Sequence, residues 1–549
     1  MDGKALQMGK SSTTGSFFLL IGVVCSSVIL AVGTLILGNV LTADELGLYS
    51  LVVLPSLIIA YFRDMGVNSA MTQRIAALRV DNKNSEIHDV IFSGVLFQLI
   101  SGAILSILCF AIANNLAMML NNPELTGLIA LMSVSIFSSS VVSASTAIFV
   151  GFEKMKLNSF MQILQAIIKT LLGPLLVILG YSVLGAVWGS IVSVAISGLA
   201  GILLVYFVLF RPLRNEKSGK FNIKQNLFPL LKYGIPLTFS GIATGVLPYV
   251  FTAFMTPYAG VGILGNYTAA NYCAVFVTFI SFPVSTVLFP AFSKLNPKKE
   301  PEQIKTVFSS SIKYTAFLLI PTTMLVMTLS TPLLGTLFPQ DGLLSSLFTT
   351  GAELKHPHAP TFLVLSSIVN LFVLFGSLSL SAFQTGIGKT KQVMKQSLLS
   401  LAISVPFAYA IISYLGTFGG GINEVYAVIG GIVAVMVSTI PGMIWGLVWA
   451  WKNYHVKADF KNSGKIFTSS VIASIATYVI SSVLNAPHVI ILIAGTITFV
   501  FVYLISVSLI GAVNYVDIDN LKIMTSELGP ISKIIAIPLK FMQKICKNH

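Results

Sequence analysis

Residues 157–181, LNSFMQILQAIIKTLLGPLLVILGY, form an apolar segment that carries a single lysine near its centre. At a rise of ~1.5 Å per helical residue and a hydrocarbon core of ~30 Å, Lys169 lies near the midplane of a membrane. Asn158, Gln162, Gln165 and Lys169 follow one another at intervals of four, three and four residues, so a helix places them on one face. Because a buried polar face needs a partner other than lipid, the segment predicts a transmembrane helix that lines a polar interior.

The composition of the whole chain is that of a polytopic membrane protein. Of its 549 residues, 55% are hydrophobic and only 9% are charged, and the mean hydropathy is +0.88, whereas soluble domains carry about 25% charged residues. The first apolar run is too long for a signal-peptide core, so we predict a transmembrane helix there. The cysteines lack CxxC and Cys/His ligand spacing, so we expect no metal site, no disulfide framework and no cofactor. They are Cys25, Cys109, Cys273 and Cys546.

Apolar segments of about 17–25 residues, the length that spans a bilayer, occur fourteen times along the chain. The prediction is therefore an all-α polytopic fold with fourteen transmembrane helices. The expected spans are residues 16–40, 46–62, 89–113, 126–148, 157–180, 184–209, 233–255, 266–291, 312–338, 360–383, 393–415, 425–451, 466–485 and 489–513.

The positions of the basic residues agree with fourteen spans, because these residues gather in alternate loops. All but two of the 33 lysines and arginines lie in the N-terminal segment, in the C-terminal tail or in the loops after even-numbered spans. The exceptions are Lys355, in an alternate loop, and Lys169. By the positive-inside rule, both termini are cytoplasmic in a multi-pass membrane protein. The net charge of +14 is explained by loops that face anionic lipid, so we expect no nucleic-acid partner.

An internal repeat divides the expected spans. LGLYS at 46–50 matches LGNYT at 264–268, and GFEKMK at 151–156 matches GKTKQV at 388–393. An even number of helices separates the copies, so two six-helix lobes run in the same direction, as parallel repeats do. The predicted organisation is an N-lobe (1–209), a cytoplasmic amphipathic linker (210–232), a C-lobe (233–451), two added helices (452–513) and a cytoplasmic basic interfacial tail (514–549).

Motifs for ATP hydrolysis and for membrane-embedded proton or sodium relays are missing. GKT at 388–390 resembles the end of a phosphate-binding loop, but the required glycine is replaced by Phe383. Every Asp and Glu lies in a loop or at a span end, and those nearest to membrane depth are Asp64 and Asp89. Intramembrane carboxylates are the usual cation relays, so we expect no coupling through a carboxylate at the midplane.

Further polar side chains within the spans are candidates for a substrate cavity. Asn271 lies in span 8, and Asn370 lies in span 10 at helical spacing with Ser377, Ser381 and Gln384. For the hydroxyl-rich span 4, the alternative is that small hydroxylated residues allow close helix packing in lipid. For Lys169, the alternative is pairing with the C-terminal carbonyls of a neighbouring helix. The span 4 hydroxyls are Ser133, Ser135, Ser138, Ser139, Ser140, Ser143, Ser145 and Thr146.

Arg63 and Asp64 end span 2 in the sequence FRDMG. Two interpretations stay open for this pair: a solvated ion pair at the membrane interface, or an inner gate.

Six segments, in this order, resemble the polysaccharide transporter (oligosaccharide flippase) branch of the superfamily that includes multidrug MATE exporters and the lipid II flippase. They are FRDMGVNSAMTQRIA (62–76), GFEKMK (151–156), YGIP (233–236), LGNYTAANY (264–272), LFPAFSKL (288–295) and GIGKTK (386–391).

The resemblance implies a multi-pass flippase of the plasma (cell) membrane that moves a polyprenyl-pyrophosphate-linked oligosaccharide across it by alternating access. Members commonly have a cationic central cavity, for which Lys169 is the candidate by position; this chain has only one such cation. We expect Asn158, Gln162, Gln165, Asn271 and Asn370 to contribute to substrate binding, in a monomer surrounded by membrane lipids.

Two other functions remain as alternatives. The first is a cation-coupled exporter of small molecules of the MATE type, although the carboxylates of that branch are missing from the first lobe. The second is a membrane enzyme that uses Glu353, His356 and His358 in an outer loop. That loop is short and contains no arginine, so we predict a transporter rather than an enzyme.

Overall fold

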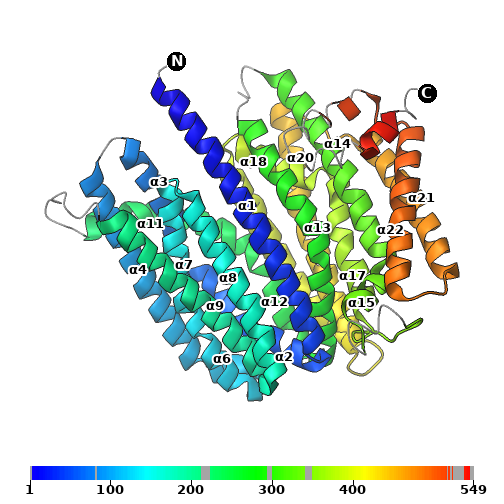
Figure 1. Ribbon diagram of the computed structural model, residues 1–549, viewed down its shortest axis with the longest axis horizontal. Helices are drawn as coiled ribbons and strands as arrows, with labels where there is room; N and C mark the ends of the chain where they lie inside the picture. Colours follow the sequence, from blue (N-terminus) through cyan, green and yellow to red (C-terminus); the bar gives the residue numbers. More distant parts are fainter. Residues whose placement is uncertain are drawn as a thin grey trace. The chain divides into compact units, whose positions relative to one another are not determined.

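The protein is described by a computed structural model that covers residues 3–80, 83–211, 223–293, 300–340, 349–515, 517–519, 522 and 537–543. Helices make up 87% of the structure, and Figure 1 shows them as long coiled ribbons. Within the described residues there is no strand, only isolated bridges between Pro339 and Leu354 and between Thr350 and Pro487. The all-α prediction is therefore confirmed.

The helices up to Leu204 are α1 (Gly3–Val40), α2 (Ala43–Arg63), α3 (Val67–Val80), α4 (Asn84–Ala111), α5 (Ala113–Met119), α6 (Thr126–Met132), α7 (Val134–Gly151), α8 (Met155–Leu176) and α9 (Ser182–Leu204). The later helices are α11 (Ile223–Gly245), α12 (Leu247–Met255), α13 (Val261–Ser293), α14 (Pro301–Thr328), α15 (Ser330–Leu337), α17 (Ala359–Ser367), α18 (Ser377–Gly386), α19 (Thr390–Gly416), α20 (Glu424–Tyr454), α21 (Phe460–Val483) and α22 (His488–Leu509).

Ten segments of the described chain are long and apolar enough to cross a membrane, and a bent pair of helices raises this number to eleven. The protein is thus a multi-pass membrane protein. Each of the fourteen expected spans overlaps a helix or a pair of helices, but the count of fourteen and the cytoplasmic location of the termini stay predictions.

The expected span 10 is not one continuous helix, which corrects the prediction of a polar face along it. A 3-10 segment, Ile368–Phe375, separates α17 from α18, and the two parts are bent by 57°. Gly376 has φ +83°, a left-handed conformation that glycine adopts without strain. Because the helix is interrupted between Asn370 and Ser377, the spacing of these two residues does not place them on one helical face.

The expected linker 210–232 is partly helical. Helix α11 begins at Ile223, so the last part of the linker continues directly into the helix of the expected span 7; residues 212–222 lie outside the described residues.

Contacts divide the chain into two compact units. The first comprises 1–268 and 408–431, and the second comprises 269–407 and 432–549. The core of the first unit contains Met71, Ile148 and Phe149, and one core of the second contains Ala473, Phe499 and Val507. The boundaries between units fall inside helices α13, α19 and α20. The division into two repeat-related lobes therefore stays a prediction.

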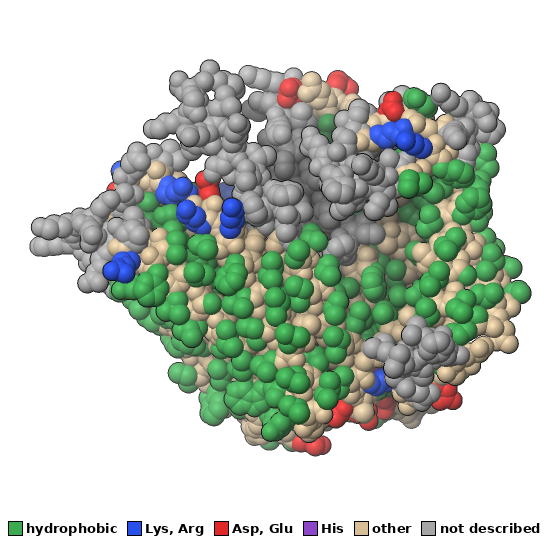
Figure 2. Space-filling model, viewed as in Figure 1, with side chains coloured by type: hydrophobic (Ala, Val, Ile, Leu, Met, Phe, Trp, Pro, Cys, Tyr) green, Lys and Arg blue, Asp and Glu red, His purple; other side chains and the backbone are tan. Residues whose placement is uncertain are grey.

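The outer surface of the first unit is suited to lipid. Figure 2 shows hydrophobic side chains over the helices on the left of the view, with Lys and Arg side chains gathered at one edge. Large apolar side chains are exposed on these helices, among them Ile107 at 67% and Leu171 at 64%. A contiguous exposed apolar surface of this kind is expected where a protein faces a bilayer.

Candidate polar site and inner turn

Helix α8 carries the polar residues around Lys169 and is held in the first unit by close packing against α1. Thr170 donates a hydrogen bond through Oγ1 to the carbonyl of Ile29 at 2.9 Å. A Cβ placed on Gly22 or Gly33 of α1 would overlap Ser159 or Thr170 of α8. Small residues allow two membrane helices to approach this closely, so α1 fixes the rotation of α8 about its axis.

The polar face of α8 points away from its lipid-exposed face. At about 3.6 residues per turn, the exposed apolar side chains form one stripe along the helix, and Asn158, Gln162, Gln165 and Lys169 form a second stripe on roughly the opposite side. The second stripe therefore faces away from the exposed apolar side of α8. The exposed side chains are Phe160 (52%), Ile167 (40%), Leu171 (64%), Leu175 (52%) and Ile178 (65%).

Lys169 is half-buried together with Gln162 and Gln165. Within the described residues, the side chains of these three make no hydrogen bond or ion pair. Asn158 is only 1% exposed, and its Oδ1 has no hydrogen-bond partner in the same part of the chain. The alternative in which neighbouring carbonyls satisfy Lys169 is thus not observed, and its ammonium group is available to an anionic ligand or to water.

The hydroxyl groups of α7 divide into two sets. Ser135, Ser138, Ser140 and Ser145 each donate to a carbonyl three or four residues earlier in the chain, which satisfies them locally and permits close packing. Ser139 and Ser143 additionally accept hydrogen bonds from the guanidinium of Arg63.

Arg63, the last residue of α2, is buried, with 7% of its surface exposed. Besides the bond to Ser139, its guanidinium donates to Ser143 Oγ at 2.9 Å and to the carbonyl of Ile136 at 3.4 Å. Its Nε has no partner within the described residues. Arg63 is therefore not a solvated ion pair at the interface; it joins α2 to α7 inside the first unit.

Asp64 accepts hydrogen bonds from residues of α3 and α4. It accepts a hydrogen bond from Gln98 Nε2 at 2.7 Å and from the backbone N–H of Asn68 at 3.1 Å, and Gln98 also donates to Asn68 Oδ1 at 3.2 Å. Gln98 is fully buried. The sequence analysis missed this residue, although a lone amide in the middle of the apolar segment 89–113 was a detectable signal.

The turn after Arg63 and Asp64 contacts α11. Met65 and Gly66 have φ values of +46° and +68°. A Cβ on Gly66 would overlap the backbone of Gly234, and a Cβ on Gly234 would overlap the backbone of Gly66. Gly234 belongs to the YGIP motif, where the predicted second repeat begins. The turn thus contacts α11 within the first compact unit.

The other predicted binding residues lie in the second unit. Asn271 is exposed on α13, and Asn370 is half-buried in the 3-10 segment that follows α17. Their participation in one site with Lys169 stays a prediction. In the outer loop proposed for a membrane enzyme, His356 is 1% exposed and packs edge-on against Phe338, with ring centroids 5.6 Å apart.

The chain matches a known protein family and a named relative. The model of the family described as polysaccharide biosynthesis protein matches residues 12–296. A protein of Shigella dysenteriae named "Putative O-antigen transporter" is 23% identical over 399 residues, which cover 71% of this chain and 90% of that protein.

Two solved structures show the fold. The lipid II flippase MurJ in an inward closed conformation has a TM-score of 0.67 at 16% identity, over 90% of this chain and 98% of that one. An inward-facing MATE multidrug transporter of the MOP superfamily has a TM-score of 0.61 at 17% identity, over 80% of this chain and 100% of that one.

Proposed function

We propose a function from the premise that this chain belongs to the polysaccharide biosynthesis protein family: it is a flippase for a lipid-linked oligosaccharide in the cell membrane. The head group to be moved carries a sugar chain on a pyrophosphate, and the lipid is a polyprenyl chain. The transporter name of the Shigella relative and the flippase name of the MurJ structure support this class of substrate.

The observation that carries the proposal is the unpaired ammonium of Lys169 on a polar stripe directed away from lipid. An unpaired lysine at the midplane costs at least ~2.5 kcal/mol, so its presence there requires a compensating ligand or water. An anion at 4 Å is attracted by about 4 kcal/mol at an effective dielectric constant of 20. A pyrophosphate meets this requirement, and Gln162, Gln165 and Asn158 offer hydrogen bonds to the sugars beside it.

We further propose that the Arg63–Asp64 turn acts as the inner gate. Arg63 anchors the turn to α7, Asp64 anchors it to α4 through Gln98, and Gly66 meets Gly234 of the second repeat. In alternating access, this contact between repeats would open and close while the anchored cluster moves as one body. The polyprenyl chain stays in the bilayer throughout.

The test is a flipping assay with purified protein in liposomes that contain a fluorescent lipid-linked oligosaccharide. Flipping exposes the sugar to a membrane-impermeant glycosidase, and the cleaved fraction is measured over time. Lys169→Ala is expected to reduce the initial rate by at least about 100-fold, because the head-group attraction of about 4 kcal/mol is lost. Lys169→Arg keeps the charge and is expected to retain most of the activity.

The matched control is Lys154→Ala, which removes an exposed lysine just before α8 and is expected to leave the rate unchanged. Normal flipping by Lys169→Ala would exclude the assigned role of Lys169. Efflux of a fluorescent cationic drug by the wild-type protein, without flipping of the glycolipid, would favour the small-molecule exporter instead.

A further inference from the structure

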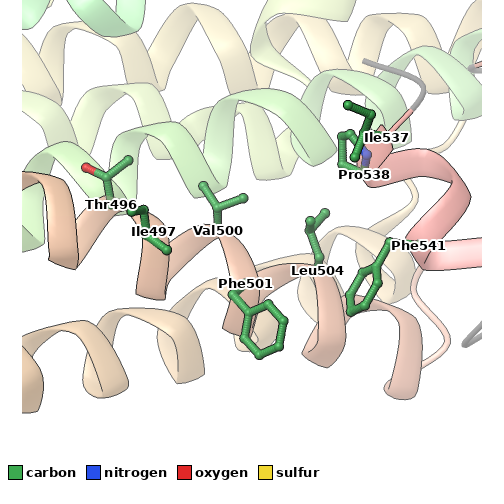
Figure 3. A pocket seen from close by; sticks show the side chains of 8 residues that line it. All are labelled: Thr496, Ile497, Val500, Phe501, Leu504, Ile537, Pro538 and Phe541. Atoms are coloured by element: carbon green, nitrogen blue, oxygen red, sulfur yellow. The ribbon is translucent and has the colours of Figure 1, made fainter. Parts of the chain in front are cut away.

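An apolar pocket lies between α22 and the short C-terminal helix 537–543, both in the second unit. Its volume is about 490 Å³, within the range of about 300–1,000 Å³ typical of ligand pockets. Figure 3 shows Val500, Phe501 and Leu504 of α22 on one side, with Ile537 and Phe541 of the short helix at one end. Apart from Thr496, the lining is wholly apolar, which suits a hydrocarbon chain.

The length of the pocket matches one leaflet of a bilayer. It follows α22 from Thr496 to Leu504, which is about 12 Å at ~1.5 Å per residue. Thr496 lies near the middle of α22 (His488–Leu509), and the short helix closes the pocket near the end of α22. Half of a ~30 Å hydrocarbon core is about 15 Å, so the pocket extends from the middle of the membrane towards one head-group layer.

The short helix is a fixed wall of this pocket. Leu539 and Met542 are 5% and 0% exposed and pack in the same core as Phe499 of α22. Nearby, Lys313 of α14 and Asp517 form an ion pair at 2.5 Å, with each side chain 13% exposed. Part of the basic tail is therefore docked on the second unit, with its remaining apolar side chains directed at the pocket.

Charge at the closed end points to an anionic head group. Lys540 is exposed and lies three residues after Ile537, which makes the two neighbours on the helix surface. Lys522 contacts the amide of Gln543, and the carboxylate of Asp519 accepts a hydrogen bond from the same amide at 3.0 Å. On and beside the short helix, the described residues thus include two lysines and one aspartate that already accepts a hydrogen bond from an amide, which leaves a net positive charge.

We infer that this pocket binds one acyl chain of an anionic membrane phospholipid, with the phosphate beside Lys540. The inference rests on the multi-pass membrane location alone and is independent of the proposed glycolipid transport. A bound phospholipid would stabilise the packing of the short helix 537–543 against α22.

The test uses the full-length protein in detergent, titrated with phosphatidylglycerol or phosphatidylcholine of identical chains, with bound lipid counted by native mass spectrometry. Wild type is expected to retain phosphatidylglycerol about fivefold more strongly, as ~1 kcal/mol per lysine predicts. Lys540→Ala is expected to remove this preference. Val500→Trp fills the pocket and is expected to remove retention of both lipids.

Matched controls are Lys461→Ala, an exposed lysine at the start of α21, and Ile475→Trp, a lipid-facing position of α21 that is 61% exposed. Both are expected to bind as wild type does, and size-exclusion profiles verify that every variant is folded. Equal retention of the two lipids by wild type, or unchanged retention by Val500→Trp, would overturn the inference. Displacement of phosphatidylglycerol by an equal concentration of polyprenyl phosphate would assign the pocket to a polyprenyl chain instead.

Discussion

Helices α8 and α19 follow corresponding motifs of the two predicted sequence repeats, but their polar side chains differ in exposure. In α8, Lys169 and its neighbouring glutamines are half-buried and have no partner in the described chain. In α19, the polar residues Gln396, Ser397 and Ser404 are buried, at 8%, 7% and 0% exposure. Ser404 donates to the carbonyl of Ser400, whereas Gln396 Nε2 has no partner within the described residues. The region around 404–407, which corresponds to Lys169, contains no charge.

This difference shows that helices at corresponding places of the two predicted repeats differ in their chemistry. The same asymmetry holds at the end of α2. Aligning LGLYS with LGNYT places Arg63 opposite Ser281, so only the first repeat has the buried guanidinium. We therefore expect substitutions in the first repeat to have large effects and substitutions at corresponding places in the second to have small ones.

The largest effect is expected for Lys169→Val, which gives α8 the apolar character of α19 at this depth. The flipping rate in liposomes should fall by at least about 100-fold, since the sequence predicts no other lysine or arginine at that depth to replace the charge. Val405→Ala in the corresponding region of α19 should stay within about twofold of wild type. Similar losses of flipping rate in both variants would show that α8 and α19 contribute equally to transport, which would contradict the expected difference between them.

Arg63→Ser, which installs the residue of the second repeat, is expected to lower the free energy of unfolding by about 3 kcal/mol, because hydrogen bonds from a charged donor are lost. Tryptophan fluorescence during chemical unfolding in mild detergent measures this change. Arg74→Ser removes an exposed ion pair with Glu86 and should cost less than about 1 kcal/mol. An equal loss of unfolding free energy in Arg63→Ser and Arg74→Ser would mean that the burial of Arg63 adds nothing to stability.

Gly66→Ala is expected to cost about 2 kcal/mol of unfolding free energy, since a left-handed conformation costs ~1–2 kcal/mol in any residue with a Cβ and the new Cβ overlaps Gly234. Thermal unfolding followed by fluorescence checks this prediction. Gly127→Ala is the control, because its Cβ meets no atom within 4 Å; it should leave the protein as stable or more stable. A neutral Gly66→Ala would show that the contact with α11 is dispensable.

The smallest effect is expected for Gln98→Leu, about 1 kcal/mol in unfolding free energy, because Asp64 loses one of two hydrogen bonds while apolar volume is kept. The exposed Gln73 of α3 provides the control variant Gln73→Leu, which should be neutral. The same unfolding assay serves both variants. A neutral Gln98→Leu would limit the network at the inner turn to Arg63 and α7.

Much of the fold follows from local information. Hydrophobic runs long enough to span a bilayer predicted helices at every expected range, because backbone hydrogen bonds in lipid are satisfied within a helix. Helix α2 begins where Thr42 and Glu45 form a capping box, a signal readable from the sequence. The interruption of span 10 was not predicted, since Gly376 is one of 43 glycines and only its surroundings select the left-handed conformation.

By itself, the sequence determined the membrane environment and the helical class of the fold, since hydropathy and helical periodicity act along the chain; the parallel repeat and the midplane depth of Lys169 stay predictions. Only the tertiary structure decided which polar residues meet. Ser139 and Ser143 accept hydrogen bonds from Arg63, and Gln98 donates one to Asp64. Gly66 lies against the backbone of Gly234. Such pairings depend on how each helix is rotated and how closely it approaches its neighbours. Packing between segments distant in sequence sets both, so a local sequence pattern cannot predict them.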